Sequence, residues 1–111
     1  MVYNRIIIVG RLVKDPEARA LPDGEDITRF TVATNQAWSD KNGQKQESSE
    51  FHTIVCVGDL ARTMGKLLKQ SSLVLVEGRK QTRTWEDRIT KEPRKTVEII
   101  ADTVQYLDPT K

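Results

Sequence analysis

Residues 73–85 read LVLVEGRKQTRTW. The first half, Leu73 to Val76, is apolar, and the second half carries the cations Arg79, Lys80 and Arg83 before it ends at Trp85. This pattern predicts one long strand that leaves a core. Because side chains on a strand alternate faces, Arg79, Arg83 and Trp85 share one face. Cationic side chains leading to a flat aromatic ring suit the phosphates and stacked bases of a single nucleic-acid strand. A solvated strand end with a half-buried tryptophan fits the stretch equally well.

The positive charge of the chain is concentrated around this stretch. The net charge of the 111 residues is +2, which alone does not indicate a nucleic-acid partner. Between Arg79 and Lys95, however, there are seven cations and three acidic residues, so the net positive charge of this segment exceeds that of the whole chain. A concentrated basic patch is typical of a protein with a polyanionic partner, and a solvated charged hairpin is the alternative. The length and the 37% hydrophobic content predict one domain with a small core.

Strand patterns recur on both sides of this stretch. We expect strands over residues 3–12, 27–37, 50–57, 73–85 and 96–107, and a short strand piece over 18–21. Phe30 and Val32 are the predicted core residues of the second long strand, and Gly10 indicates a sharp bend in the first. The polar segments 39–49 and 84–93 are predicted hairpin loops, and Asn42-Gly43 lies at the centre of the first.

Residues 59–68 form the one predicted helix. An apolar stripe at helical spacing consists of Leu60, Met64, Leu67 and Leu68, and Asp59 is the predicted N-cap. Five strands with a helix only between the third and fourth match the OB-fold, so we expect an all-β, five-stranded Greek-key barrel. This fold binds its ligands on the face of its second and third strands, beside the loops between strands one and two and between strands four and five.

The sequence offers no catalytic or metal-binding constellation. His52 and Cys56 are four residues apart on one strand, which separates them by about 13 Å, too far for a hydrogen bond. Cys56 lies in an apolar run, which favours a buried thiol over a nucleophile. We expect Glu77 and Glu98 to form ion pairs on the strand surface. We therefore expect no enzyme, metal or cofactor. Without a secretory signal or a membrane-spanning run, a cytoplasmic location is the default.

Several short motifs occur in a characteristic order. They are Asn4-Arg5 before IIIVGRL, Asp15-Pro16-Glu17, Phe30 to Thr34 with Trp38 soon after, Glu50-Phe51-His52, Val57-Gly58 before Leu60-Ala61, Val76-Glu77-Gly78 and Thr82-Arg83-Thr84-Trp85. Together they closely resemble the bacterial-type single-stranded DNA-binding proteins, a family of homotetrameric OB-fold proteins. The likeness runs from Asn4 to about Leu107. We therefore expect an OB-fold domain over residues 1–107 and a short C-terminal end over residues 108–111.

The resemblance implies a set of DNA-contacting side chains. The family stacks four aromatic rings on bases, and three of these positions match Trp38, Phe51 and Trp85. The fourth position falls on Val57, which cannot stack. Cationic positions of the family match Arg5, Arg19, Lys41 and Arg83, and Arg79 adds a cation. Thr53 and Asp59 stand where the family often has cations, so we expect somewhat weaker DNA binding than in a typical member.

The resemblance also implies an assembly and a role. We expect a homotetramer with His52 and the Leu75 region at subunit contacts, because the family places a histidine at that position of its interface and one barrel cannot bury every apolar strand face. The implied role is sequence-independent protection of single-stranded DNA in replication, recombination and repair, in the bacterial cytoplasm or in an organelle. The family's acidic C-terminal tail is not present in these residues, so they do not predict tail-mediated partners.

Two alternatives stay open at this point. An OB-fold accessory module, for example a primosome-like subunit with a protein partner, is expected to bind DNA weakly or only together with that partner. An RNA-binding OB domain is expected to prefer RNA through its 2′-hydroxyl groups. Titrations with oligo-dT, duplex DNA and oligo-U distinguish the three.

Overall fold

The computed structural model describes residues 2–109, so residue 1 of the predicted domain and residues 110–111 of the predicted C-terminal end lie outside the described part. The elements in chain order are β1 (Ile6–Leu12), β2 (Glu17–Ala20), β3 (Asp26–Ser39), β4 (Lys45–Val57), α1 (Gly58–Leu67), β5 (Leu73–Glu86) and β6 (Pro93–Tyr106). Over residues 2–109 there is no helix with the length and hydropathy needed to span a membrane.

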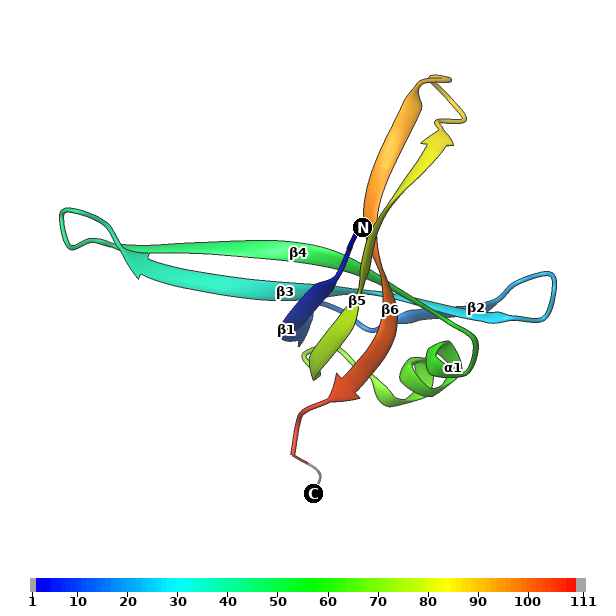
Figure 1. Cartoon of the computed structure of the whole chain (residues 1–111), viewed down its shortest axis with the longest axis horizontal. Coiled ribbons are helices and arrows are strands. Elements are labelled where there is room, and N and C mark those ends of the chain that lie inside the picture. The colour runs from blue at the N-terminus through cyan, green and yellow to red at the C-terminus, as the bar shows by residue number, and fades with distance from the viewer. Residues whose placement is uncertain (1, 110–111) are drawn as a thin grey trace.

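Five of these strands close into a barrel. β1 pairs antiparallel with β5 along its length and also with β3 at Arg11 and Leu12, while β4 runs parallel to β6 at Ile54 and Val55. The ring is completed by the β5–β6 and β3–β4 hairpins, and β2 adds an outer strand to β3. Figure 1 shows α1 at the lower end of the barrel, between β4 and β5 in the chain. The predicted OB-fold barrel with one helix is confirmed.

Gly10 lies where β1 passes closest to β3. A Cβ atom at this position would fall 2.3 Å from the carbonyl oxygen of Ala33 and 2.7 Å from Cγ1 of Val32. Only a residue without a side chain allows the two strands to approach this closely, and the approach closes the barrel. The sequence predicted a sharp bend at Gly10, and what the structure shows there is a close contact between strands.

The core follows the alternation of the strands. Phe30 and Val32 are buried, as predicted, and Cys56 is fully buried, where desolvation raises the pKa of its thiol to about 12. The helix differs from its predicted stripe, because Leu67 is exposed and Ala61 is buried instead. The backbone at Ala61 contacts β3, because its carbonyl accepts a hydrogen bond from the hydroxyl of Thr28 at 2.7 Å.

The start of the helix also differs from the prediction. Val57 occupies the N-cap position with extended backbone, and no side chain caps the helix, so the predicted Asp59 N-cap is wrong. Asp59 lies in the first turn, where Arg62 Nη1 donates to its Oδ1 at 2.9 Å. Gly58 has φ of 70°, a left-handed conformation that favours glycine and turns the chain from β4 into α1 one residue earlier than expected.

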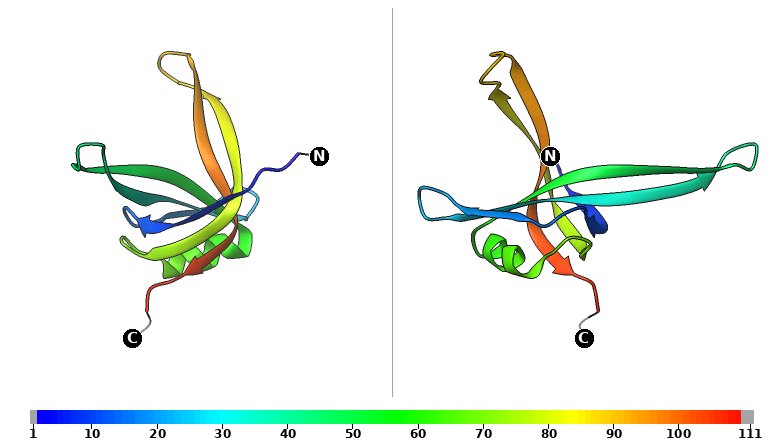
Figure 2. Two further views of the ribbon diagram at one scale, coloured as in Figure 1. Left: turned by 60° about the vertical axis from the view of Figure 1, so that its left-hand side comes forward. Right: turned by 180° about the vertical axis from the view of Figure 1, so that it is seen from behind.

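Two long hairpin arms extend beyond the barrel (Figure 1; Figure 2). The β3–β4 arm keeps its register from Ile27 opposite Val57 out to Ser39 opposite Lys45, and the β5–β6 arm reaches Glu86 opposite Pro93. The sequence predicted polar loops where these outer strands lie. The backbone hydrogen bonds of a hairpin do not require a buried face, so strand pairing continues through these polar residues. The loops are therefore shorter than predicted and consist of residues 40–44 and 87–92.

Both ends of the domain are fastened to β5. At the start, Asn4 replaces a ladder pair: its Nδ2 donates to the carbonyl of Lys80 at 2.8 Å, and the Lys80 amide donates to its Oδ1 at 3.0 Å. This contact explains why β1 begins at Ile6 although the sequence predicted strand from Tyr3. At the other end, the amide of Leu73 donates to Asp108 Oδ2 at 2.9 Å. This bond, with the nearby guanidinium of Arg11, holds the pKa of Asp108 below its ordinary value.

Candidate nucleic-acid interface

The three predicted stacking residues are large, exposed aromatic side chains on the two arms. Trp38 is 49% exposed and Phe51 is 65% exposed, both on the β3–β4 arm, and Trp85 is 42% exposed on the β5–β6 arm. The indole nitrogen of Trp85 donates to Thr96 Oγ1 at 3.1 Å, which fixes the ring on the arm while a face of it stays accessible. Exposed rings of this size offer stacking platforms to unpaired bases.

The register shows that these rings do not share one flat surface. On the β3–β4 arm, Phe51 lies opposite Ala33, and Trp38 lies opposite Gln46. Trp38 is five residues beyond Ala33, about 17 Å along the strand, and the odd number puts it on the other face of the hairpin. A nucleic-acid strand that touches both rings must therefore reach both faces of the arm. The sequence alone did not show this, because it depends on the pairing register.

Val57, at the position where the family resemblance expects a fourth ring, ends β4 opposite Ile27. Its side chain is exposed, and it offers an aliphatic contact rather than a stacking platform. The four positions that the resemblance implies therefore hold three exposed aromatic rings and one exposed aliphatic side chain.

Two of the predicted cations, Arg5 and Arg79, lie beside partly exposed acidic residues. Arg5 Nη2 is 2.7 Å from Glu77 Oε2, and this hydrogen bond raises the pKa of Arg5 above its ordinary value. Arg5 also contacts Asp102 at 3.3 Å, and Arg79 Nη1 lies 3.8 Å from the same carboxylate. Exposed ion pairs of this kind are weak, so the guanidinium groups can turn to a phosphate at little energetic cost. The predicted surface pair of Glu77 is confirmed.

Arg83 belongs to a different and more buried cluster. Its Nε lies 3.6 Å from Glu98 Oε2, and Arg29 Nη2 lies 3.0 Å from the same oxygen. Glu98 is only 3% exposed, so the expectation of a surface pair is wrong for this residue. The sequence reasoning missed Arg29 as a functional candidate. The alternation of the strand does give one signal, because Arg29 lies between the buried residues Thr28 and Phe30 and must therefore point outward. Its partner Glu98 is far away in the sequence, so no local pattern connects the two residues.

The remaining predicted cations, Arg19 and Lys41, form no ion pair within residues 2–109. Arg19 lies on β2, and Lys41 lies in the turn between β3 and β4. Arg19, Lys41 and Arg83 therefore belong to three different hairpins, β2–β3, β3–β4 and β5–β6, and Figure 2 shows these hairpins pointing in different directions.

The two predicted subunit contacts lie on different surfaces. His52 alternates with the exposed Phe51 and shares the inner face of β4 with Ile54, and its Nε2 is 2.9 Å from Thr34 Oγ1. Leu75 points away from the core, directly opposite Val9 on β1. The two residues are not on neighbouring strands, because β6 lies between β4 and β5 in the sheet.

The described residues contain little that suits catalysis. Among residues 2–109, no three His, Cys, Asp or Glu side chains are grouped so that they could hold a metal ion. Cys56 is buried with a raised pKa, so its thiol is protonated at neutral pH and is not a ready nucleophile. The arrangement is suited to binding: flexible cations and exposed rings along two arms and a barrel.

A closed five-stranded barrel with one helix between its long strands β4 and β5 defines an OB-fold protein, and this one has exposed rings and cations on its arms. The sequence profile of the single-strand binding protein family matches residues 3–107. The chain belongs to this family.

Known proteins with similar sequences carry the corresponding name. The chain is 40% identical over 107 residues to the single-stranded DNA-binding proteins of Neisseria meningitidis serogroup A (strain Z2491) and serogroup B (strain MC58). Each alignment covers 96% of this chain and 61% of the relative, so the chain spans about three fifths of the length of these curated relatives.

Solved structures show the same fold. A Plasmodium falciparum SSB in complex with single-stranded DNA superposes with a TM-score of 0.89 at 27% identity, over 97% of both chains. A deletion mutant of the single-stranded DNA-binding protein from Thermus aquaticus superposes with a TM-score of 0.83 at 30% identity, over 96% of this chain and 51% of that one.

Proposed function

We propose that this protein binds single-stranded DNA without sequence preference and is not an enzyme. The observation that carries the proposal is the placement of exposed rings and cations together on the β3–β4 and β5–β6 arms of an OB-fold barrel. Family membership and the likeness to an SSB structure that contains single-stranded DNA support it. The protected strand would arise in replication, recombination and repair, and the proposed location is the bacterial cytoplasm.

The proposed contacts divide into two kinds. Trp38, Phe51 and Trp85 stack on bases, and each such contact contributes roughly 1–3 kcal/mol. Arg5, Arg19, Lys41, Arg79 and Arg83 neutralise phosphates and release counterions, which makes binding weaken with salt. Neither kind reads base edges, so the proposal predicts no sequence preference beyond the stacking strength of each base.

We propose that the working form is a homotetramer with His52 and the Leu75 region at subunit contacts. The half-buried Leu75 lies opposite the exposed Val9, and with the exposed Ile7 on β1 these side chains form an apolar patch on the outside of the barrel. A tetramer built from two-fold axes needs two different interfaces, which agrees with the placement of His52 and Leu75 on separate surfaces. Four barrels on one strand would also gain avidity, which offsets the ring absent at Val57.

The oligomeric state has its own test. Light scattering at micromolar concentration should give about four times the chain mass of 12.6 kDa, and Leu75→Lys should lower the mass by breaking one interface. A monomeric wild-type protein that still binds oligo-dT tightly would contradict both the interface and the avidity argument.

Fluorescence anisotropy with labelled oligo-dT, duplex DNA and oligo-U tests the binding proposal. We expect oligo-dT to bind most tightly and its affinity to fall with salt. Equal or tighter binding of oligo-U would favour an RNA-binding domain, and the absence of oligo-dT binding at low salt would favour an accessory module with a protein partner.

A further inference from the structure

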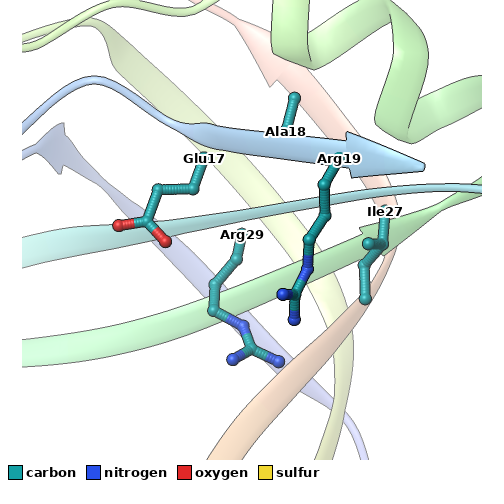
Figure 3. A pocket seen from close by; sticks show the side chains of 5 residues that line it. All are labelled: Glu17, Ala18, Arg19, Ile27 and Arg29. Atoms are coloured by element: carbon teal, nitrogen blue, oxygen red, sulfur yellow. The ribbon is translucent and has the colours of Figure 1, made fainter. Parts of the chain in front are cut away.

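Arg29 and Arg19 lie side by side at a pocket on the outer face of the β2–β3 ladder. The pocket has a volume of about 120 Å³ and is lined by Glu17, Ala18, Arg19, Ile27 and Arg29. Figure 3 shows that both arginine side chains leave their strands on the same side. The register puts Glu17 opposite Arg29 and Arg19 opposite Ile27, so the two arginines are diagonal neighbours. Long side chains at such positions can reach one another, and here both can reach one anion.

The guanidinium of Arg29 forms an ion pair with a buried carboxylate. Glu98 on β6 is buried, and its Oε2 lies 3.0 Å from Arg29 Nη2 and 3.6 Å from Arg83 Nε. A buried carboxylate needs such cations, because an unpaired charge is strongly unfavourable away from water. The Arg29 side chain is nevertheless 33% exposed, and a guanidinium has five N–H donors, so donors remain for a ligand on the outer face.

The charges around the pocket favour an anion. Glu17 lines the pocket and would repel one, but its Oε1 lies 3.5 Å from Lys14 Nζ, which offsets its charge. Arg19 has no acidic partner within residues 2–109. Arg83, on the β5–β6 arm, lies close to this region because it contacts Glu98, the carboxylate that also pairs with Arg29. Arg29 therefore lies between two cations, because it shares the pocket with Arg19 and the buried carboxylate of Glu98 with Arg83.

We propose that Arg29 is an additional phosphate-contacting residue and that, with Arg19, it binds a backbone phosphate of single-stranded DNA at this pocket. The strand would then cross the β2–β3 ladder on its way between the two arms. Glu98 contributes by fixing the Arg29 and Arg83 guanidinium groups in advance, which reduces the ordering needed on binding. This inference deepens the proposed function and rests on it.

The test compares the salt dependence of oligo-dT binding in the full chain and its variants. Arg29→Gln should reduce the slope of log affinity against log salt by about 0.7, the loss of one phosphate contact on a single strand. Arg29→Lys should recover the slope, because it restores the charge. Glu17→Gln should tighten binding, because it removes the acidic group from the same pocket.

Arg62 provides a matched control. It is also a half-exposed arginine paired with two acidic residues, Asp26 and Asp59, but it lies on α1. Arg62→Gln should leave the slope unchanged. If Arg29→Gln and Arg62→Gln behave alike, Arg29 is not a phosphate contact.

A second variant separates binding from folding. Arg29→Gln leaves Glu98 buried with one partner at 3.6 Å and is expected to lower stability. The double variant Arg29→Gln with Glu98→Gln removes the buried charge and should show the same loss of slope. An unchanged slope in both variants, with the wild-type protein binding oligo-dT, would overturn this inference alone. A wild-type protein that does not bind oligo-dT would overturn the proposed function as well.

Discussion

Replacing Gly10 with alanine should prevent the barrel from closing normally. A Cβ atom there would lie 2.3 Å from the Ala33 carbonyl oxygen, whereas ordinary van der Waals contact begins at 3.4 Å. β1 and β3 would have to separate by about 1 Å, since the obstacle is backbone and not a movable side-chain end. This separation would weaken the pairing of Arg11 with Ala33 and of Leu12 with Val32, the contacts that join β1 to β3.

The expected loss of unfolding free energy is about 3 kcal/mol. Overpacked sites typically lose 1–3 kcal/mol, and the upper end applies here because the barrel cannot relax without losing hydrogen bonds. The usual gain of about 0.4–1 kcal/mol from reduced unfolded-state entropy does not offset this. With a urea slope of about 1.5 kcal/mol/M, the unfolding midpoint should fall by about 2 M.

Urea unfolding followed by tryptophan fluorescence measures this shift, at one fixed protein concentration because assembly would also affect stability. Gly65→Ala in α1 is the control. A Cβ there would lie 3.1 Å from side-chain atoms of Ala18 and Thr28. This contact is tight but it is made with side chains and not with backbone, so a small shift relieves it and the gain of about 1 kcal/mol in helix propensity offsets its cost. If Gly10→Ala unfolds at the wild-type midpoint, the reasoning about barrel closure is wrong.

Three further predictions concern binding and pH. Trp85→Ala should weaken oligo-dT binding by roughly 1–3 kcal/mol, measured by anisotropy, and an unchanged affinity would remove Trp85 from the site. The Arg79→Ala, Arg83→Ala double variant should reduce the salt slope by about 1.4, and an unchanged slope would exclude both. Asp108 has a lowered pKa in the folded state, so it stabilises the protein above its ordinary pKa and this contribution is lost as the pH falls below about 4. The Asp108→Asn variant should therefore lose less thermal stability than the wild-type protein between pH 5 and pH 2. An equal loss in the two proteins would contradict the assignment of this contribution to Asp108.

Local patterns in the sequence predicted the elements and the fold class well. The alternation around Phe30 and Val32 fixed the core face, and the position of the helix among the strands indicated the OB-fold. The arms were predicted too short, because strand pairing through polar residues leaves no hydrophobic pattern. Asp59 does not cap the helix, because the helix begins at the left-handed Gly58, one residue before the predicted start.

The site was harder to predict because it depends on register and on distant pairs. The sequence named Trp38 and Phe51 separately, but only the pairing of β3 with β4 shows that they lie on opposite faces of the arm. The buried cluster of Glu98 with Arg29 and Arg83 joins three strands, and no local spacing connects these residues. Alternation does show that Arg29 points outward, but not that a buried carboxylate holds it.

The central claim is that rings and cations act together on one DNA strand, and one titration tests it most directly. Tryptophan fluorescence is followed while the protein is titrated with oligo-dT or with an abasic deoxyribose-phosphate chain of the same length, each at two salt concentrations. The account predicts that oligo-dT quenches the fluorescence and binds more tightly than the abasic chain, and that both affinities fall with salt by similar slopes. Equal affinity for the two chains, with no quenching by oligo-dT, would contradict the account.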